Sequence, residues 1–397
     1  MLLAPADSAS TALARHFAAA MARLGPFGTP PHLAAAVSGG ADSTALALLA
    51  HDWAVRNQGS LLALIVDHGL RSESGAEAAL TATRLAARGI ACKIITLSGL
   101  AGPGVQEKAR TARYAALAQA ALAQGRLHLL LGHHQADQAE TVAMRARRGP
   151  GGAEGIAAWA ARGNVLLLRP LLDVPPAVLR AYLAAQGMEW VEDPSNQNPR
   201  FERVRIRFEG AGMQPASAAA RQEREQEAAR FLARHAALRP EGFAVLDAPA
   251  APAAALAALL RVVGGNVYAP DQPATAALAA RLRPATLAGV RILAAGRLGP
   301  GWLLVREPAA LAPPVPARRG ALWDGRFTLE AAPPPGQSLG ALGDEAKNYK
   351  KYNNLPSVVL RTMAALRAAD GTLSFPAPVL FTPPSPAAPH PFFSAGQ

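Results

Sequence analysis

A short apolar stretch, a glycine-rich polar turn and a second apolar stretch follow one another between residues 33 and 50. Leu33 to Val37 is typical of a buried strand, and Thr44 to Ala50 is typical of a helix. Between them lies Ser38-Gly39-Gly40-Ala41-Asp42-Ser43, whose glycines can reach backbone angles that a Cβ forbids. Such a turn leaves N–H groups pointing outward at a helix N-terminus, which suits an anion and above all phosphate. The sequence therefore predicts a strand–loop–helix phosphate site here.

Apolar runs and helical patterns alternate through the first half of the chain. The predicted elements are strands at 61–66, 93–97, 128–131 and 165–168, and helices at 74–88, 105–124, 136–148 and 176–186. Continuous apolar strands separated by helices imply a parallel sheet covered on both faces. Because such sheets bind ligands at the C-terminal ends of their strands, the polar turns at Ser38, Asp67 and His133 should meet in one crevice. The predicted fold class is α/β, followed by a helical linker and a smaller C-terminal α+β region.

Composition divides the 397 residues into three predicted domains, 1–215, 216–312 and 313–397. A charged helix at 217–238 has no strand before it and is expected to act as a connector. Beyond it, strands are predicted near 290–293 and 302–305. The prolines at 313–316 and 333–335 mark expected linkers, and the proline-dense end from residue 377 is expected to be a disordered tail.

The charge balance narrows the classes of partner. The chain carries 40 basic and 28 acidic residues, a net charge of +12, which favours a polyanion such as nucleic acid. Cys92 is the only cysteine, so an intrachain disulfide and a cysteine-held metal cluster are both excluded. The first ten residues do not read as a signal peptide, and no apolar run of about 20 residues suggests a membrane span. A cytoplasmic protein without membrane contact is expected.

Two further motifs fall at predicted strand ends. In the segment from Ile65 to Arg71, His68 and Arg71 could contact a nucleotide, or the segment could be a turn with polar surface groups. In Gly132-His133-His134 the histidines could contact a nucleotide or cap the next helix, and a metal held by them is less favoured. Asp137 and Glu140 follow one helical turn apart, and this carboxylate pair could hold an amine or Mg²⁺.

Arginines form two groups that suit phosphate. Arg110 and Arg113 share one face of a predicted helix, where a solvated charged surface is the alternative. Residues 200–207 place four arginines among apolar residues directly after Glu192-Asp193-Pro194-Ser195-Asn196. This basic ridge suits an RNA backbone, although a salt-bridged surface segment explains it equally well.

The order of these motifs resembles that of the tRNA(Ile)-lysidine synthetase family of PP-loop ATP pyrophosphatases. The segments that carry the resemblance are Ser38 to Ser43, Val66 to Arg71, Ala109-Arg110 with Arg113-Tyr114, Gly132 to His134 with Asp137-Gln138 and Glu140-Thr141, Arg169 to Leu172, and Glu192 to Asn196 with Arg203 and Ile206-Arg207. They cover about the first 210 residues. The loop alone is shared by many enzymes, whereas Asp-His-Gly-Leu-Arg and Glu-Asp-Pro-Ser-Asn are much more specific.

The resemblance implies an enzyme, an ATP-dependent C–N ligase that joins free L-lysine to C2 of the wobble cytidine in the CAU anticodon of tRNA(Ile). The reaction would pass through an adenylated cytidine and convert ATP to AMP and pyrophosphate, so that the tRNA reads AUA and is charged with isoleucine. ATP and Mg²⁺ are the implied cofactors, and a homodimer is one expected state. The first domain would be catalytic, the second would contact tRNA, and the third would hold a small RNA-contacting segment.

The resemblance also assigns roles to residues. The implied catalytic residues are Asp42, Arg113, Asp137 and Glu140, with Asp42 also the metal ligand. The implied nucleotide-binding residues are Ser38, Gly39, Gly40, Ala41, Asp42, Ser43, Val66, His68 and His133. The implied residues for lysine and tRNA are Asp137, Glu140, Arg203, Arg205 and Arg207.

Two departures from the family pattern leave alternatives open. Ala136 stands where the family usually has the first of two aspartates, and Ala157, Ala158 and Trp159 replace the usual end of a glycine-rich segment. The alternatives are a tRNA thiolase, which usually needs more cysteines than Cys92, a free-standing amidotransferase-type synthetase, and a tRNA-binding paralogue without turnover. The intact loop at 38–43 argues against the last of these.

Overall fold

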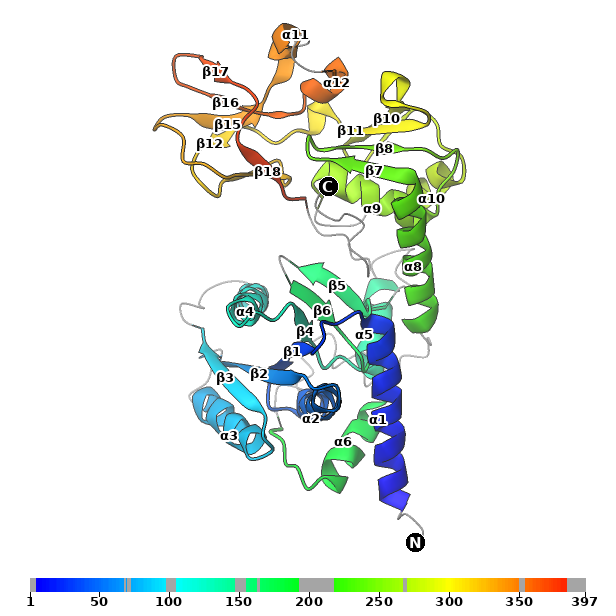
Figure 1. Ribbon diagram of the computed structural model, residues 1–397, viewed down its shortest axis with the longest axis vertical. Coiled ribbons are helices and arrows are strands. Elements are labelled where there is room, and N and C mark those ends of the chain that lie inside the picture. Colours follow the sequence, from blue (N-terminus) through cyan, green and yellow to red (C-terminus); the bar gives the residue numbers. More distant parts are fainter. Residues whose placement is uncertain are drawn as a thin grey trace. The chain divides into compact units, whose positions relative to one another are not determined.

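The computed structural model describes residues 5–67, 69, 73–97, 105–146, 155–162, 165–192, 218–266, 270–349 and 354–383. The chain forms two compact units, Met1–Gln222 and Glu223–Gln397. Figure 1 shows a helix-covered sheet in the first unit and smaller sheets with helices in the second. The predicted fold class is confirmed. None of the described helices is long and apolar enough to span a membrane.

The first unit is built on a six-stranded sheet with the order β3-β2-β1-β4-β6-β5. The strands are β1 (His32–Val37), β2 (Ser60–Asp67), β3 (Ala91–Thr96), β4 (His128–Leu130), β5 (Trp159–Arg162) and β6 (Val165–Leu168). All neighbouring pairs are parallel except β5 and β6, which run antiparallel. β1 pairs with β2 from His32 opposite Ser60 to Val37 opposite Ile65. The antiparallel edge strand β5 and the early start of β3 differ from the sequence prediction.

Helices cover both faces of this sheet. They are α1 (Pro5–Leu24), α2 (Ala41–Arg56), α3 (Ser74–Ala86), α4 (Val105–Leu122), α5 (Gln135–Ala146) and α6 (Pro176–Ala185). Alternate residues of β1 enter different cores: Leu33, Ala35 and Val37 pack with α1, α2 and α6, whereas Ala34 packs with α4. This two-sided burial explains why β1 reads as a continuous apolar run.

The chain reverses its direction of travel across the sheet at β1. From β1 it winds outward through β2 to β3, then crosses back through α4 to place β4 on the other side of β1. Loops leaving β1 and β4 therefore diverge at one point, which is where open α/β sheets bind ligands. The candidate site lies at this switch point.

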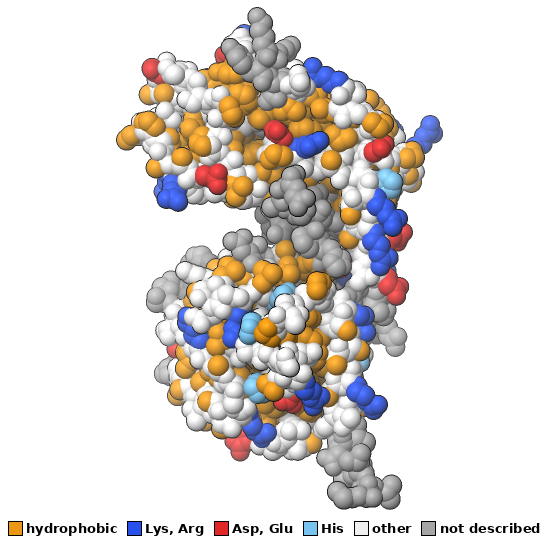
Figure 2. Space-filling view, in the orientation of Figure 1, with side chains coloured by type: hydrophobic (Ala, Val, Ile, Leu, Met, Phe, Trp, Pro, Cys, Tyr) orange, Lys and Arg blue, Asp and Glu red, His pale blue; other side chains and the backbone are white. Residues whose placement is uncertain are grey.

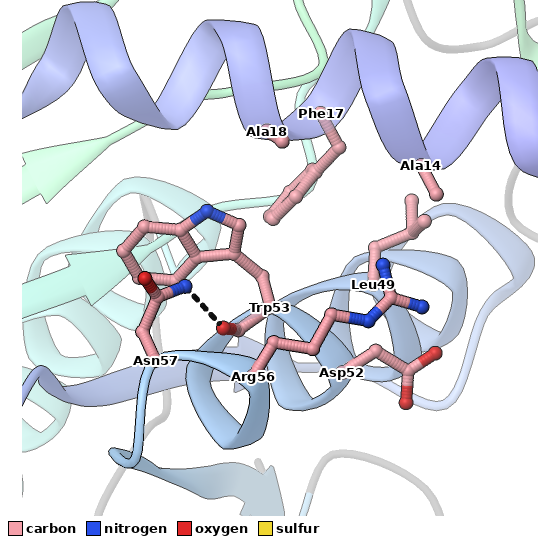
Figure 3. Close-up of a pocket in the computed structure, with 8 residues that line it drawn as sticks. All are labelled: Ala14, Phe17, Ala18, Leu49, Asp52, Trp53, Arg56 and Asn57. Carbon is pink, nitrogen blue, oxygen red and sulfur yellow. Dashed lines mark hydrogen bonds between the residues drawn. The ribbon is translucent and has the colours of Figure 1, made fainter.

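A cavity of about 300 Å³ lies at the opposite end of α2, between α1 and α2. Figure 3 shows Phe17 of α1 facing Leu49 and Trp53 of α2, with Asp52 and Arg56 nearby and Asn57 donating to the Trp53 carbonyl at 2.7 Å. The part of α2 that lines it is the C-terminal half, whereas the polar loop precedes the N-terminus of that helix. The cavity is therefore separate from the candidate site.

The second unit combines short helices with three antiparallel sheets. Besides most of α8 (Ala218–His235), its described α-helices are α9 (Ala253–Gly264), α10 (Gln272–Ala280), α11 (Ala346–Tyr349) and α12 (Ser357–Leu360). The sheets contain β7 (Ala236–Arg239), β8 (Phe243–Leu246), β11 (Trp302–Arg306), β10 (Val290–Ala294) and β9 (Ala285–Leu287); β12 (Val315–Pro316), β15 (Ser338–Ala341), β16 (Ala364–Arg367) and β17 (Leu373–Ser374); and β13 (Leu322–Trp323), β14 (Phe327–Leu329) and β18 (Val379–Phe381). The predicted strands near 290 and 302 are β10 and β11, and the prolines at 313–316 include β12 rather than only a connection. The prediction of a disordered tail from residue 377 is wrong at its start, because Ala377 is buried and β18 pairs with β14.

A buried ion cluster joins two sheets within the second unit. The Asp324 carboxylate accepts from Arg306 at 3.0 and 3.1 Å and from the Arg326 Nε at 2.9 Å. Arg326 is fully buried, and desolvation lowers its pKa to about 10 despite the opposing attraction of Asp324. Arg326 also donates to the Gly242 carbonyl at 3.0 Å, so the cluster fixes the chain around both arginines.

The charged helix predicted at 217–238 is α8 (Ala218–His235), and the last predicted residues form the start of β7 instead. Figure 2 shows basic and acidic side chains interspersed along it. The opposite side of the helix is apolar, because Ala228 and Leu232 are buried in the core of the second unit.

Candidate functional site

The loop at Ser38–Ser43 is shaped by Gly39. Its φ is +87°, and a Cβ there would lie 2.5 Å from the Thr81 Oγ1 of α3. The Gly39 carbonyl also accepts from the Val191 N–H at 2.8 Å. Glycine is therefore required at this position both for its backbone angle and for the close approach of α3.

The serines of the loop act mainly within it. The Ser43 Oγ accepts from the Ser38 N–H at 3.1 Å and donates to the Gly40 carbonyl at 3.0 Å. Gly40 precedes α2 without any side-chain cap, so no side chain at that position covers the first N–H groups of the helix. Those N–H groups and the positive end of the helix dipole suit an anion, as the sequence predicts.

Asp42 lies in the first turn of α2, and its two carboxylate oxygens differ in their contacts. Its Oδ2 is 3.3 Å from the His134 Nε2, whereas its Oδ1 is buried and has no hydrogen-bond partner among the described residues. No group of three or more His, Cys, Asp or Glu in the described part of the chain could hold a metal. A single carboxylate oxygen beside an anion seat fits Mg²⁺, which is often held by one or two carboxylates together with substrate phosphates.

The turn after β4 lies directly against the start of α2. A Cβ on Gly132 would lie 3.1 Å from both the Ser43 N and Cα, so a larger residue would push the two turns apart by a few tenths of an ångström. His133 follows half-buried and His134 buried. The structure thus brings together the two glycine-containing turns that the sequence places 90 residues apart.

The two candidate lysine-binding carboxylates of α5 have different surroundings. The Asp137 carboxylate accepts from the His134 N–H at 3.0 Å and lies 3.6 Å from the His134 Nε2. It therefore caps its own helix as well as facing the site. Glu140 is 2% exposed, whereas the Asp137 side chain is 16% exposed, so Asp137 is the more accessible of the pair.

The end of β2 supplies a third turn at the same edge of the sheet. Val66 is half-buried, and Asp67 accepts from the Gly69 N–H at 2.9 Å and the Ser74 Oγ at 2.6 Å. Asp67 therefore links the strand to the start of α3. His68 lies outside the described residues, as do Arg203, Arg205 and Arg207.

A cluster of guanidiniums surrounds Tyr114 on α4. The guanidinium carbons of Arg110 and Arg113 lie 5.8 and 5.6 Å from the centre of its ring. A side-chain hydrogen bond joins Tyr114 to Arg169, at the end of β6. Burial lowers the pKa of Arg169, Tyr114 raises it, and the nearby Arg221 and Arg110 lower it further. This concentration of positive charge suits phosphate groups.

Sequence reasoning did not assign a role to Gln138 or Arg169, and for His134 it left open whether the residue contacts a nucleotide or caps the next helix, although all three lie inside segments that it singled out. Their contacts depend on partners distant in the chain. His134 touches Asp42, and Gln138 and Arg169 bond backbone atoms of Ile156 and Ala157. The only sequence signal for these residues was that they lie inside the motifs, which does not indicate their contact partners.

Comparison with known proteins defines the class first. Residues 10–210 match the family described as PP-loop domain, so the chain is a PP-loop protein. Two similar curated proteins are the tRNA(Ile)-lysidine synthases of Ruegeria pomeroyi and Rhizobium meliloti. The first is 37% identical over 79% of this chain and 80% of its own length, and the second is 36% identical over 78% and 76%. The chain therefore belongs to the tRNA(Ile)-lysidine synthase family, and the resemblance predicted from the motifs is confirmed.

Two further comparisons cover less. The tRNA(Ile)-lysidine synthase of Hyphomonas neptunium is 48% identical over 43% of this chain and 48% of its own length. Among solved structures, a U34-tRNA thiolase from Methanococcus maripaludis with its [4Fe-4S] cluster aligns with a TM-score of 0.40 at 17% identity, covering 48% of this chain and 70% of the thiolase. That last likeness is too low to bear on function.

Proposed function

We propose that this protein joins free L-lysine to C2 of the wobble cytidine in the CAU anticodon of tRNA(Ile), at the expense of ATP. The observation that carries the proposal is the uncapped phosphate loop at the switch point, with the buried open oxygen of Asp42 beside it, in a chain of this family. The phosphate loop favours a nucleoside triphosphate as one substrate, and the family relation favours tRNA and lysine as the other substrates.

The chemistry proceeds in two displacements. The C2 oxygen of cytidine attacks the α-phosphate of ATP, and pyrophosphate leaves. An amine of lysine then attacks C2, the bond from C2 to the bridging oxygen breaks, AMP leaves, and the amine loses its proton. The protein's contribution is placement and stabilisation of charge.

We assign a role to each candidate residue, from its position where the structure describes it and from the family resemblance for His68. The N–H groups of Gly40, Ala41 and Asp42 would hold the phosphates, and Asp42 would hold Mg²⁺ against them, which neutralises the charge that develops on pyrophosphate. Arg113 would neutralise phosphate charge. Val66 and His133, with His68 and the serines 38 and 43, would border the nucleotide.

Asp137 and Glu140 would take the lysine substrate, which carries two amines and needs a carboxylate-lined pocket. Asp137 is the better placed, since it is the more exposed and faces His134. One of these acidic groups or a histidine would accept the proton of the attacking amine. Ala136 is half-buried in the first turn of α5, so the proposal requires that Asp137 suffices where the family usually has two aspartates.

The tRNA would be bound through its backbone and an extruded wobble base. Arg203, Arg205 and Arg207 are the proposed backbone contacts, supported by their spacing in the sequence. A cytoplasmic location and a homodimer belong to the same proposal.

The sulfur-transfer alternative is disfavoured by the surroundings of Cys92. This cysteine lies near the start of β3, whereas the candidate site lies at the strand ends. Its Sγ donates to the Ile90 and Ala82 carbonyls at 3.4 and 3.7 Å, and burial raises the pKa of the thiol. A thiol held in this way is a poor nucleophile.

The test is pyrophosphate release from ATP in the presence of the CAU tRNA and without lysine. Asp42→Asn should abolish the release while tRNA binding stays near that of the wild type. Asp52→Asn is the matched control, because Asp52 is exposed on the same helix at its far end. A fully active Asp42→Asn variant would remove Asp42 and the loop from the proposed role.

A further inference from the structure

The backbone of three consecutive residues, Gly155 to Ala157, is held by side chains from three separate elements. Arg221 of α8 donates to the Gly155 carbonyl. Gln138 of α5 bonds both polar groups of Ile156, accepting from its N–H and donating to its carbonyl at 3.0 Å. Arg169, which follows β6, donates to the Ala157 carbonyl at 2.9 Å. We refer to Gln138, Arg169 and Arg221 as the backbone clamp.

Gln138 is the buried centre of this clamp. It is 4% exposed, and its amide pairs with Ile156 as a neighbouring strand would. A Cβ on Gly155 would collide with the Gln138 amide, so Gly155 and Gln138 fit each other sterically. Because its donor and acceptor are both used in a buried place, losing Gln138 leaves two backbone groups of Ile156 without that partner.

The clamp connects α4 and α5, two of the helices that carry the proposed catalytic groups. On one side, Gln138 directly follows Asp137 on α5, and its N–H bonds the His134 carbonyl at 3.3 Å. On the other side, Arg169 is hydrogen-bonded to Tyr114, whose ring lies against the Arg113 guanidinium on α4. A continuous chain of contacts thus runs from Asp137 to Arg113 through the backbone of Ile156 and Ala157.

We propose that the backbone clamp, acting through Tyr114, is a positioning device that fixes Arg113 of α4 relative to Asp137 of α5 for adenylation of the tRNA. This proposal rests on the proposed function. Gln138, Arg169 and Tyr114 are positioning residues, since each acts through a neighbour rather than on the nucleotide. Small errors in the placement of reacting groups cost large factors in rate, so the device affects the rate constant more than binding.

The test uses Gln138→Ala and Tyr114→Phe, alone and together. Tyr114→Phe keeps the ring beside Arg113 and removes only the hydroxyl that bonds Arg169. Each single variant should lower the single-turnover rate of tRNA-dependent pyrophosphate release by about tenfold, with the KM for ATP changed less than about twofold. Because both changes break one chain of contacts, the double variant should be no slower than the slower single variant. Gln119→Ala, an exposed change on α4, is the control and should match the wild type.

Hydrogen–deuterium exchange gives a readout that does not depend on activity. Gln138→Ala should raise exchange in the α4 peptide around Tyr114, although Gln138 lies on another helix. Any of three results would overturn the positioning role. They are single-variant rates near that of the wild type, a double variant whose rate reduction is the product of the two single reductions, and unchanged exchange around Tyr114 in Gln138→Ala. If the wild type releases no pyrophosphate, the proposed function fails, and the exchange result alone decides whether the two helices are linked.

Discussion

Replacement of Gly39 by alanine tests the architecture of the phosphate loop most sharply. The φ of +87° costs a residue with a Cβ about 1–2 kcal/mol. The new Cβ would also lie 2.5 Å from the Thr81 Oγ1, and overpacking of this kind costs about 1–3 kcal/mol. The sum is about 2–5 kcal/mol, which for a unit of this size lowers the melting temperature by about 4–20 °C.

The two contributions can be separated by thermal unfolding of matched variants. Gly187 has a φ of +59° and nothing within 4 Å of its missing Cβ, so Gly187→Ala should show only the conformational cost of about 1–2 kcal/mol. In a Thr81→Ala background, the loss of unfolding free energy caused by Gly39→Ala should fall to the loss caused by Gly187→Ala. An equal cost of Gly39→Ala in both backgrounds would refute the proposed contact with Thr81.

Three other predictions concern pH, buried charge and RNA. Burial lowers the pKa of His128, which packs against Phe27, below its unfolded value of about 6.5. The unfolded chain therefore binds the proton first as the pH is lowered, so the free energy of unfolding should fall below about pH 6.5. Urea unfolding from about pH 7 to 5.5 should show a smaller slope of this free energy against pH in His128→Leu than in the wild type, and an equal slope contradicts the assignment. Asp324→Asn should destabilise the second unit by about 3–5 kcal/mol in chemical unfolding, because two guanidiniums lose their buried partner, whereas Asp344→Asn, in an exposed pair with Arg361, should change it little. Replacement of Arg203, Arg205 and Arg207 by alanine should weaken tRNA binding. It should also reduce the slope of log affinity against log salt concentration by about one for each phosphate that the protein no longer neutralises. An unchanged slope removes these arginines from the RNA-binding surface.

Much of the first unit follows from local patterns. The apolar run at 33–37 is buried on both sides, and the glycines after it take the backbone angle that the turn requires, so strand, loop and helix could all be predicted. The edge strands were harder. β3 contains Lys93 and is largely exposed, and β5 runs antiparallel within an alanine-rich segment that lacks a strong strand pattern.

The candidate site was predictable as a set of positions but not as a set of contacts. The strand pattern placed the turns at Ser38, Asp67 and His133 at one edge of the sheet because parallel strands end together. It did not show that Gly132 touches Ser43, or that Asp137 caps its own helix. Such roles depend on distances between distant segments, which no local spacing encodes.

The second unit was the least predictable part. Its strands are two to five residues long and lie among alanines and prolines, so their periodicity is weak. Its buried charge cluster depends on Asp324, a residue with a φ of +52° in a turn between two short strands. Nothing near Asp324 in the sequence distinguishes it from an exposed turn residue.

The central claim is tested most directly by incubating the purified protein with ATP, Mg²⁺, labelled lysine and a CAU-anticodon tRNA(Ile). An otherwise identical tRNA with a different wobble base is the control. The proposed function predicts that label enters only the tRNA with the wobble cytidine and only when ATP is present, which would also show that Ala136 is tolerated. Binding of the tRNA without pyrophosphate release or lysine incorporation would contradict the claim and favour a tRNA-binding protein without turnover.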